Sequence, residues 1–211
     1  MLFRSRLFGV CTTAAQYFHL LRRQAALLTS DPLPLVVLTP KSLLRHPMMS
    51  SRPVDLATGR WQPVIDDTER RASAKGVRRL LLCSGKAAID LLTSPLREAA
   101  PAVAVCRVEQ LYPLPVPDIV GAIERYPALE EIVWVQEEPE NMGAWEFVRP
   151  SLQELAGSRR FTVLARPRSS SPAEGSAARH AHNQEQLVAR ALQVEARRVA
   201  RSVRREPAAG V

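Results

Sequence analysis

The sequence predicts an α/β fold with three layers, in which a mainly parallel five-stranded sheet carries helices on both faces. Two observations support this prediction. Short apolar runs rich in β-branched residues recur along the chain, as is typical of buried strands. Segments with apolar residues at helical spacing separate these runs, and strands joined by helices of this size require right-handed crossovers and parallel pairing.

The first element is an amphipathic helix expected over residues 13–28. Thr12 or Thr13 can cap its start, because a side-chain hydroxyl accepts from a free backbone N–H there. Asp31 and the prolines that follow it end the pattern. The apolar positions that recur at three and four residues are Ala14, Tyr17, Phe18, Leu21, Ala25 and Leu28.

Five strands follow, and we expect them at residues 35–38, 78–83, 103–108, 132–135 and 161–165. The intervening helices are predicted at residues 41–45, 86–92, 118–126, 144–155 and 180–199. The polar segment 48–76 lacks periodicity and is expected to run over the surface, with Asp66, Asp67 and Glu69 as its acidic centre. Residues 166–178 are rich in Ser and Pro and predict a long loop.

Composition indicates one soluble domain with tails. Hydrophobic residues make up 46% of the 211 residues, and no run approaches the roughly 20 apolar residues of a membrane span. The net charge of +8 would suggest nucleic acid, but much of the excess lies in a tail, so a solvated helix end is favoured and nucleic acid is not expected. Cys11, Cys83 and Cys106 are isolated, which indicates buried reduced thiols and a cytoplasmic protein.

An acidic corner follows the strand at residues 132–135. Gln136, Glu137 and Glu138 come at its carboxyl end, and Asn141 with Gly143 permits a turn into the next helix. In open α/β sheets this edge collects ligands and partners. The residues alone favour a structural corner, because no His or Cys lies nearby to complete an acid/base pair, and no catalytic residue is assigned.

A second candidate site comes at residues 39–46, where Lys41, Arg45 and His46 lie between a strand end and a helix start. Free N–H groups and cationic side chains there suit an anion. Alternatively, Arg45 pairs with an acid such as Glu137 and orders the loops. No metal site is expected, because the last helix offers only two histidines and no third ligand.

Four motifs in one order carry a resemblance to a known family: LTPKSLLRHP at 38–47, LCSGK at 82–86, VEQLYP at 108–113 and WVQEEPENMGAW at 134–145. Together they resemble the carboxyl-terminal domain of the decarboxylase component of 2-oxoglutarate dehydrogenase, a domain similar to the last domain of transketolases. The match runs over residues 12–195. Residues 1–11 are interpreted as a truncated or misjoined amino-terminal segment, and residues 196–211 as an Arg-rich extension.

The resemblance implies a carboxyl-terminal fragment of an oxidoreductase of the tricarboxylic acid cycle. The family enzyme decarboxylates 2-oxoglutarate and transfers the succinyl group to a lipoyl group, using thiamine diphosphate and magnesium held by two preceding domains. This chain would then hold no cofactor and be inactive alone. The implied partners are the missing domains, a second subunit and the lipoyl succinyltransferase. The residues implied in the contact with the second subunit are Gln136, Glu137, Glu138 and Asn141. The alternative is a free-standing binding or scaffold module whose basic tail reaches an acidic partner.

The resemblance also suggests an effector site. Some relatives bind acetyl-CoA between domains, and two of their ligand residues match Arg23 and Gln110. The pair of arginines that those relatives carry falls at Pro117 and Asp118, which cannot replace them. We therefore expect another effector or anion. The candidate residues for that site are Arg23, Lys41, Arg45, His46 and Gln110.

Overall fold

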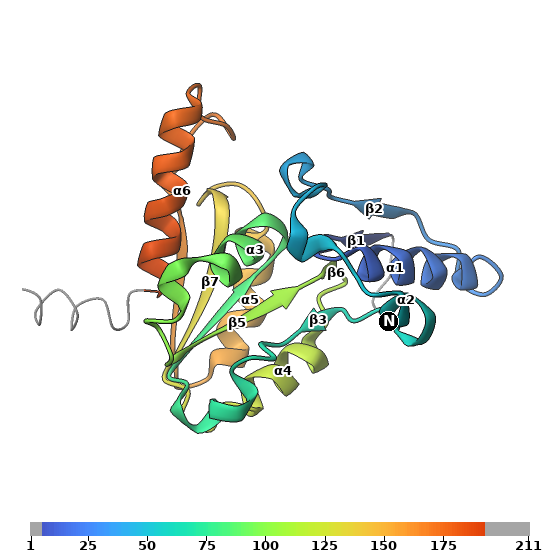
Figure 1. Ribbon diagram of the computed structural model, residues 1–211, viewed down its shortest axis with the longest axis horizontal. Coiled ribbons are helices and arrows are strands. Elements are labelled where there is room, and N and C mark those ends of the chain that lie inside the picture. Colours follow the sequence, from blue (N-terminus) through green and yellow to red (C-terminus); the bar gives the residue numbers. More distant parts are fainter. Residues whose placement is uncertain (1–5, 193–211) are drawn as a thin grey trace, which may run out of the picture.

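The computed structural model describes residues 6–192, and its centre is a five-stranded sheet (Figure 1). The strand order is β3-β5-β4-β7-β8. All neighbours are parallel except β3, which pairs antiparallel with β5. The strands are β3 (Val64–Ile65), β4 (Arg79–Cys83), β5 (Val103–Val108), β7 (Glu131–Pro139) and β8 (Arg160–Arg166).

Helices cover both faces of this sheet, which gives three layers. One face packs against α4 (Val116–Glu124) and α5 (Trp145–Ala156). The other packs against α3 (Gly85–Thr93) and α6 (Ala177–Leu192). The side chains of a strand alternate between the two cores. In β4, Leu80 and Leu82 point to the first core, whereas Leu81 and Cys83 point to the second.

A second, three-stranded sheet lies beside the first, with the order β2-β1-β6 (Figure 1). Its strands are β1 (Leu7–Gly9), β2 (Leu35–Val37) and β6 (Gln110–Tyr112), and α1 (Ala14–Leu27) and α2 (Pro53–Thr58) lie next to it. The Val10 N–H donates to the Glu109 carbonyl at 2.8 Å and joins β1 to the strand that leaves the main sheet.

The predicted fold class is confirmed, but the membership of the sheets differs from the prediction. The strand expected at residues 35–38 is β2 and lies in the small sheet. The fifth strand of the main sheet is β3, inside the segment expected to run over the surface, and its two residues are too short to show a period. Residues 7–9, assigned to the amino-terminal segment, form β1. The Arg-rich extension lies outside the described residues.

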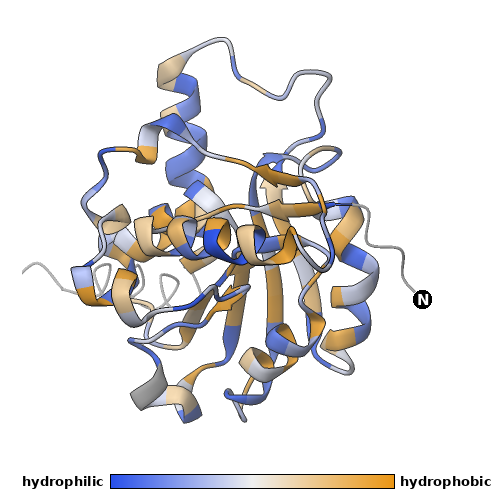
Figure 2. Cartoon of the chain, turned by 90° about the vertical axis from the view of Figure 1, so that its right-hand side faces the viewer, coloured by the Kyte–Doolittle hydropathy of each residue, from blue (hydrophilic) through white to orange (hydrophobic). Residues whose placement is uncertain are grey.

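The helix predicted at residues 13–28 forms, with Thr13 accepting a hydrogen bond from the Gln16 N–H. Its buried side is mixed, because Ala15 and Leu20 are buried beside polar residues. Tyr17 and Leu21 are 44% and 43% exposed, whereas Gln16 and His19 are buried. Gln16 bonds the backbone of Gln62. Most of the apolar surface of α1 therefore faces outward, across the side of the molecule turned to the viewer in Figure 2.

Two acidic residues that the sequence places on the surface are buried. Asp66 accepts from the Tyr126 hydroxyl at 2.8 Å and from Arg125 at 2.9 Å. Asp67 accepts from Arg97. Partners on two distant segments thus compensate both carboxylates and hold the connection to β4 against the core.

The three cysteines are buried, as predicted. Between residues 6 and 192, no helix is long and apolar enough to cross a membrane.

Candidate functional site

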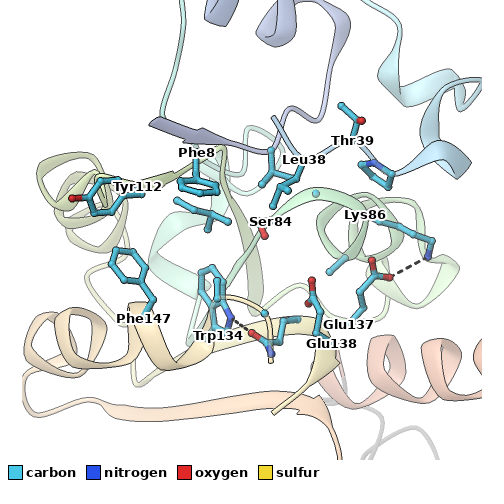
Figure 3. Close-up of a pocket in the computed structure, with 18 of the residues that line it drawn as sticks. Phe8, Leu38, Thr39, Ser84, Lys86, Tyr112, Trp134, Glu137, Glu138 and Phe147 are labelled. Carbon is cyan, nitrogen blue, oxygen red and sulfur yellow. Dashed lines mark hydrogen bonds and ion pairs between the residues drawn. The ribbon is translucent and has the colours of Figure 1, made fainter. Parts of the chain in front are cut away.

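A cavity of about 930 Å³ opens where β4 and β7 end, between the main sheet and the small sheet. Its two ends differ in chemistry (Figure 3). The rings of Tyr112 and Phe147 lie together at one end, with centroids 5.8 Å apart. Lys86, Glu137 and Glu138 lie at the other end. The cavity can take a ligand or a side chain that has an apolar body and a polar or charged tip.

Two glycines shape the polar end. Gly85 begins α3 with φ +55°, and an added Cβ would lie 2.8 Å from a methyl group of Val10. Gly143 has φ +68°, and an added Cβ would lie 3.1 Å from the side chains of Gln136 and Glu138. Glycine adopts such backbone angles without the steric cost that other residues meet. The chain therefore turns tightly at both places, which keeps the edge of the sheet open.

Gln136 lies within β7, and its side chain holds the turn that follows the strand. Its side-chain oxygen accepts from the Trp134 Nε1–H and the Trp145 backbone N–H, both at 3.0 Å. Its side-chain nitrogen donates to the carbonyls of Pro139 at 3.1 Å and Met142 at 2.7 Å. The side chain is buried. Gln136 thus fits the structural corner that the residues alone favour.

Gln136→Met is expected to lower the free energy of unfolding by about 2 kcal/mol, because two buried donors and two carbonyls lose their partner at unchanged side-chain size. Chemical denaturation followed by tryptophan fluorescence measures this loss. The matched control is Glu138→Gln, which changes an exposed side chain in the same turn. Equal stability of the two variants would contradict the structural role of Gln136.

Glu137 faces Lys86, one of the cationic residues that line the cavity. Its carboxylate lies 3.9 Å from Lys86 Nζ, and Lys86 also binds Asp90 one turn further along α3. Burial raises the pKa of Glu137, and the charge of Lys86 opposes that rise. Among the described residues, Lys86 is the ion-pair partner of Glu137, so the pairing of Arg45 with Glu137 is not formed.

The other two predicted contact residues near this turn, Glu138 and Asn141, have different surroundings from each other. Glu138 lines the cavity and is exposed. Asn141 bonds Ser169 in both directions, donating to its carbonyl at 2.9 Å and accepting from its N–H at 3.0 Å. The turn after β7 is thereby tied to the loop after β8.

The structure joins only some of the predicted effector residues. Arg23 Nη1 donates to Gln110 Oε1 at 2.7 Å, and Gln110 is buried. Lys41 and Arg45 are exposed. Lys41 begins a short 3₁₀ helix, Lys41–Leu43, directly after the cavity-lining Pro40, and Arg45 follows that helix. His46 Nδ1 accepts from the Met48 N–H and caps the next turn. None of these three is among the residues that line the cavity. Arg23 and Gln110 connect α1 to β6.

Sequence reasoning missed the aromatic end of the cavity. Phe8 comes from β1, Tyr112 from β6 and Phe147 from α5, so three segments far apart in the chain supply it. Phe147 is exposed on a helix that is otherwise well packed, and this exposure points to the aromatic end of the cavity.

A thiamine diphosphate site with magnesium needs ligands for the ion. Such a site needs carboxylate or carbonyl oxygens that converge on the ion. Within residues 6–192, no group of three or more His, Cys, Asp or Glu side chains could hold a metal ion.

The strand order, the helices on both faces and the cavity at the carboxyl edge define a three-layer α/β domain like the last domain of transketolases. Residues 50–192 match the family described as 2-oxoglutarate dehydrogenase C-terminal, and the chain belongs to this family.

Curated relatives agree with this assignment. The chain is 48% identical over 190 residues to the 2-oxoglutarate dehydrogenase E1 component of Bacillus mycoides (strain KBAB4), and 47% identical to that of Bacillus cereus (strain G9842). Each match covers 87% of this chain and 20% of the relative. The chain therefore spans about a fifth of the length of these relatives.

Proposed function

We propose that the chain is the carboxyl-terminal domain of a thiamine-dependent subunit that decarboxylates 2-oxoglutarate in the cytoplasm, and that it contributes contacts rather than catalytic groups. The remainder of that enzyme and a second subunit are its partners, and the lipoyl succinyltransferase receives the product. The bound cofactor would supply the carbanion chemistry. The residues of this chain would position the domains that hold it.

The exposed apolar side of α1 carries this proposal. Helices that flank a core normally bury their apolar side. Here Tyr17, Phe18, Leu21 and Leu28 are exposed, while polar Gln16 and His19 are buried. Several exposed apolar side chains on one helix, beside buried polar ones, indicate a contact with further protein. The acidic turn of Glu137, Glu138 and Asn141 is a second contact, towards the other subunit.

We further propose that this domain binds an effector near the small sheet. Its candidate residues are Arg23, which donates to Gln110, and the sequence neighbours Lys41, Arg45 and His46. An anion bound between this domain and its neighbour would find charged donors on this face.

A chimera tests the proposed contacts. The Bacillus mycoides relative is made without its carboxyl-terminal fifth, and this chain is fused in its place. We expect the shortened relative to be inactive and the chimera to reduce ferricyanide in the presence of 2-oxoglutarate, thiamine diphosphate and magnesium. The isolated chain should show no turnover. Activity of the isolated chain would refute the contact role, and a folded but inactive chimera would favour the free-standing module.

A charged residue on α1 gives the sharper test. Leu21→Glu in the chimera is expected to lower activity at least about tenfold, because a buried, unpaired charge at the contact costs several kcal/mol. The matched control is Leu96→Glu. Leu96 is exposed to the same degree, at 45%, but lies on a turn away from α1. If both variants keep full activity, the exposed side of α1 makes no contact.

A further inference from the structure

A second pocket adjoins the end of β7, where Pro139 lines it. It has a volume of about 500 Å³ and is bounded by the end of β8, the loop 167–175 and one side of α6. Small-molecule sites in proteins measure roughly 300–1,000 Å³. We call it the Arg166 pocket, after the buried side chain at its base.

The charge of the Arg166 pocket is strongly positive. Arginines 166, 168, 179 and 190 line it against a single carboxylate, that of Glu174. Arg168 lies on the loop, and Arg179 and Arg190 lie on α6. All three are exposed, and Arg168 lies 4.0 Å from the carboxylate of Glu140. The excess of positive charge around a pocket of this size indicates an anionic ligand.

Arg166 is buried without its full set of partners. Its side chain is 9% exposed. Nη2 donates to Gln184 Oε1 and lies 3.1 Å from His180 Nδ1. Among the described residues, Nε has no hydrogen-bond partner, and neither has Glu174 Oε2, which lies 3.7 Å from Arg166 Nη1. That separation is too long for a hydrogen bond. Arg166 therefore has donor capacity that Glu174 leaves unused.

We propose that the Arg166 pocket binds the phosphate group of a small phosphorylated metabolite, which takes the place of Glu174 beside Arg166. A carboxylate satisfies one guanidinium fork, whereas a phosphate offers more oxygen atoms in a tetrahedral arrangement. The side chain of Asn183 now donates to Glu174 and becomes free for the ligand when Glu174 leaves. Ser176 caps the amino end of α6, whose positive dipole also faces this region.

The position of the arginines on α6 defines which of them reaches the phosphate. Arg179 is in the first turn of α6, near Glu174 and Asn183. Arg190 is eleven residues further on, about 16 Å along the helix axis. One phosphate cannot contact both guanidinium groups closely. Arg179 thus belongs to the phosphate end, and Arg190 reaches only a more distant part of the metabolite.

Calorimetric titration of the whole 211-residue chain with inorganic phosphate at low salt tests the proposal. Glu174→Gln keeps the side-chain size and the acceptor for Asn183 but removes the competing charge, so we expect about tenfold tighter binding. Arg179→Gln is expected to weaken binding about tenfold. Arg190→Gln removes the same formal charge at the far end and is the matched control, with a change below about twofold.

Two results would overturn the proposal. Unchanged affinity of Glu174→Gln would show that phosphate does not displace Glu174. Equal weakening by Arg179→Gln and Arg190→Gln would show general charge attraction without a site. A measurement on the unaltered chain adds an independent check: the nuclear magnetic resonance signal of Arg166 Nε–H should shift saturably with phosphate, and a signal that stays in place contradicts the proposal. None of these readouts depends on decarboxylase activity, so the Arg166 pocket and the proposed function can fail separately.

Discussion

Asp67→Asn is expected to lower the free energy of unfolding by about 3–5 kcal/mol, the cost of breaking one partner from a buried ion pair. The Asp67 side chain is 1% exposed. Both of its oxygens accept from Arg97 Nη2, at 2.7 and 2.8 Å, and one also accepts from the Val105 N–H at 2.8 Å. Asparagine keeps the shape but leaves the buried Arg97 with only the exposed carboxylate of Glu69 to oppose its charge.

Arg97 provides its own control, because a second carboxylate binds the same guanidinium. Glu69 accepts from Arg97 Nε at 3.2 Å, but its side chain is 71% exposed. Exposed ion pairs contribute little, so Glu69→Gln is expected to cost less than about 1 kcal/mol. Urea denaturation at neutral pH measures both variants. Similar losses would mean that burial does not set the strength of this pair.

The main sheet could be predicted from sequence because its strands are locally encoded. The runs at β4, β5 and β7 are apolar over several residues, and each is followed by a segment of helical period. The small sheet could not be predicted in the same way. Its strands have three residues each, and β1 pairs with β6 across about a hundred residues of chain. Such pairing depends on the folded core, which no local pattern reports.

The candidate site shows the same limit. The turn after β7 could be located because a strand end, a proline and a glycine mark it in sequence. The roles within it depend on partners from elsewhere. Gln136 is buried because Trp134 and Trp145 offer donors to it, and Glu137 meets Lys86 because α3 begins beside β7. The outward apolar side of α1 was also beyond sequence reasoning, since an amphipathic pattern does not say which side is covered.

A second large effect concerns pH. Glu109 is fully buried where β5 leaves the main sheet for β6, and burial raises its pKa from the usual 4.5 to about 7. Its carboxylate accepts from the Thr12 N–H at 2.9 Å and from the Thr12 hydroxyl, which also accepts from Arg107. These contacts and the charge of Arg107 lower the pKa, but desolvation is the larger influence.

The direction of the pH dependence follows from which protonation state of Glu109 the folded chain prefers. Because the pKa of Glu109 is higher in the folded state than in the unfolded state, folding favours the protonated acid. The free-energy penalty for burying ionised Glu109 is absent below about pH 4.5. It grows between pH 4.5 and 7 and is complete above pH 7, where the difference of the two pKa values corresponds to about 3 kcal/mol. Glu109 therefore makes the folded chain less stable as pH rises through this window.

Glu109→Gln is expected to remove this pH dependence. Glutamine can accept from the Thr12 N–H and donate to the Thr12 hydroxyl oxygen, so the link between the two sheets persists without a charge. The variant should be more stable than the parent by about 3 kcal/mol at pH 8 and equal to it near pH 4.5, by urea denaturation across that range. Glu124→Gln, at an exposed site on α4, is the control and should follow the parent. A variant that is less stable than the parent at pH 8 would show that the Thr12 contacts outweigh the cost of burying the charge, and that the ionised form of Glu109 holds the two sheets together.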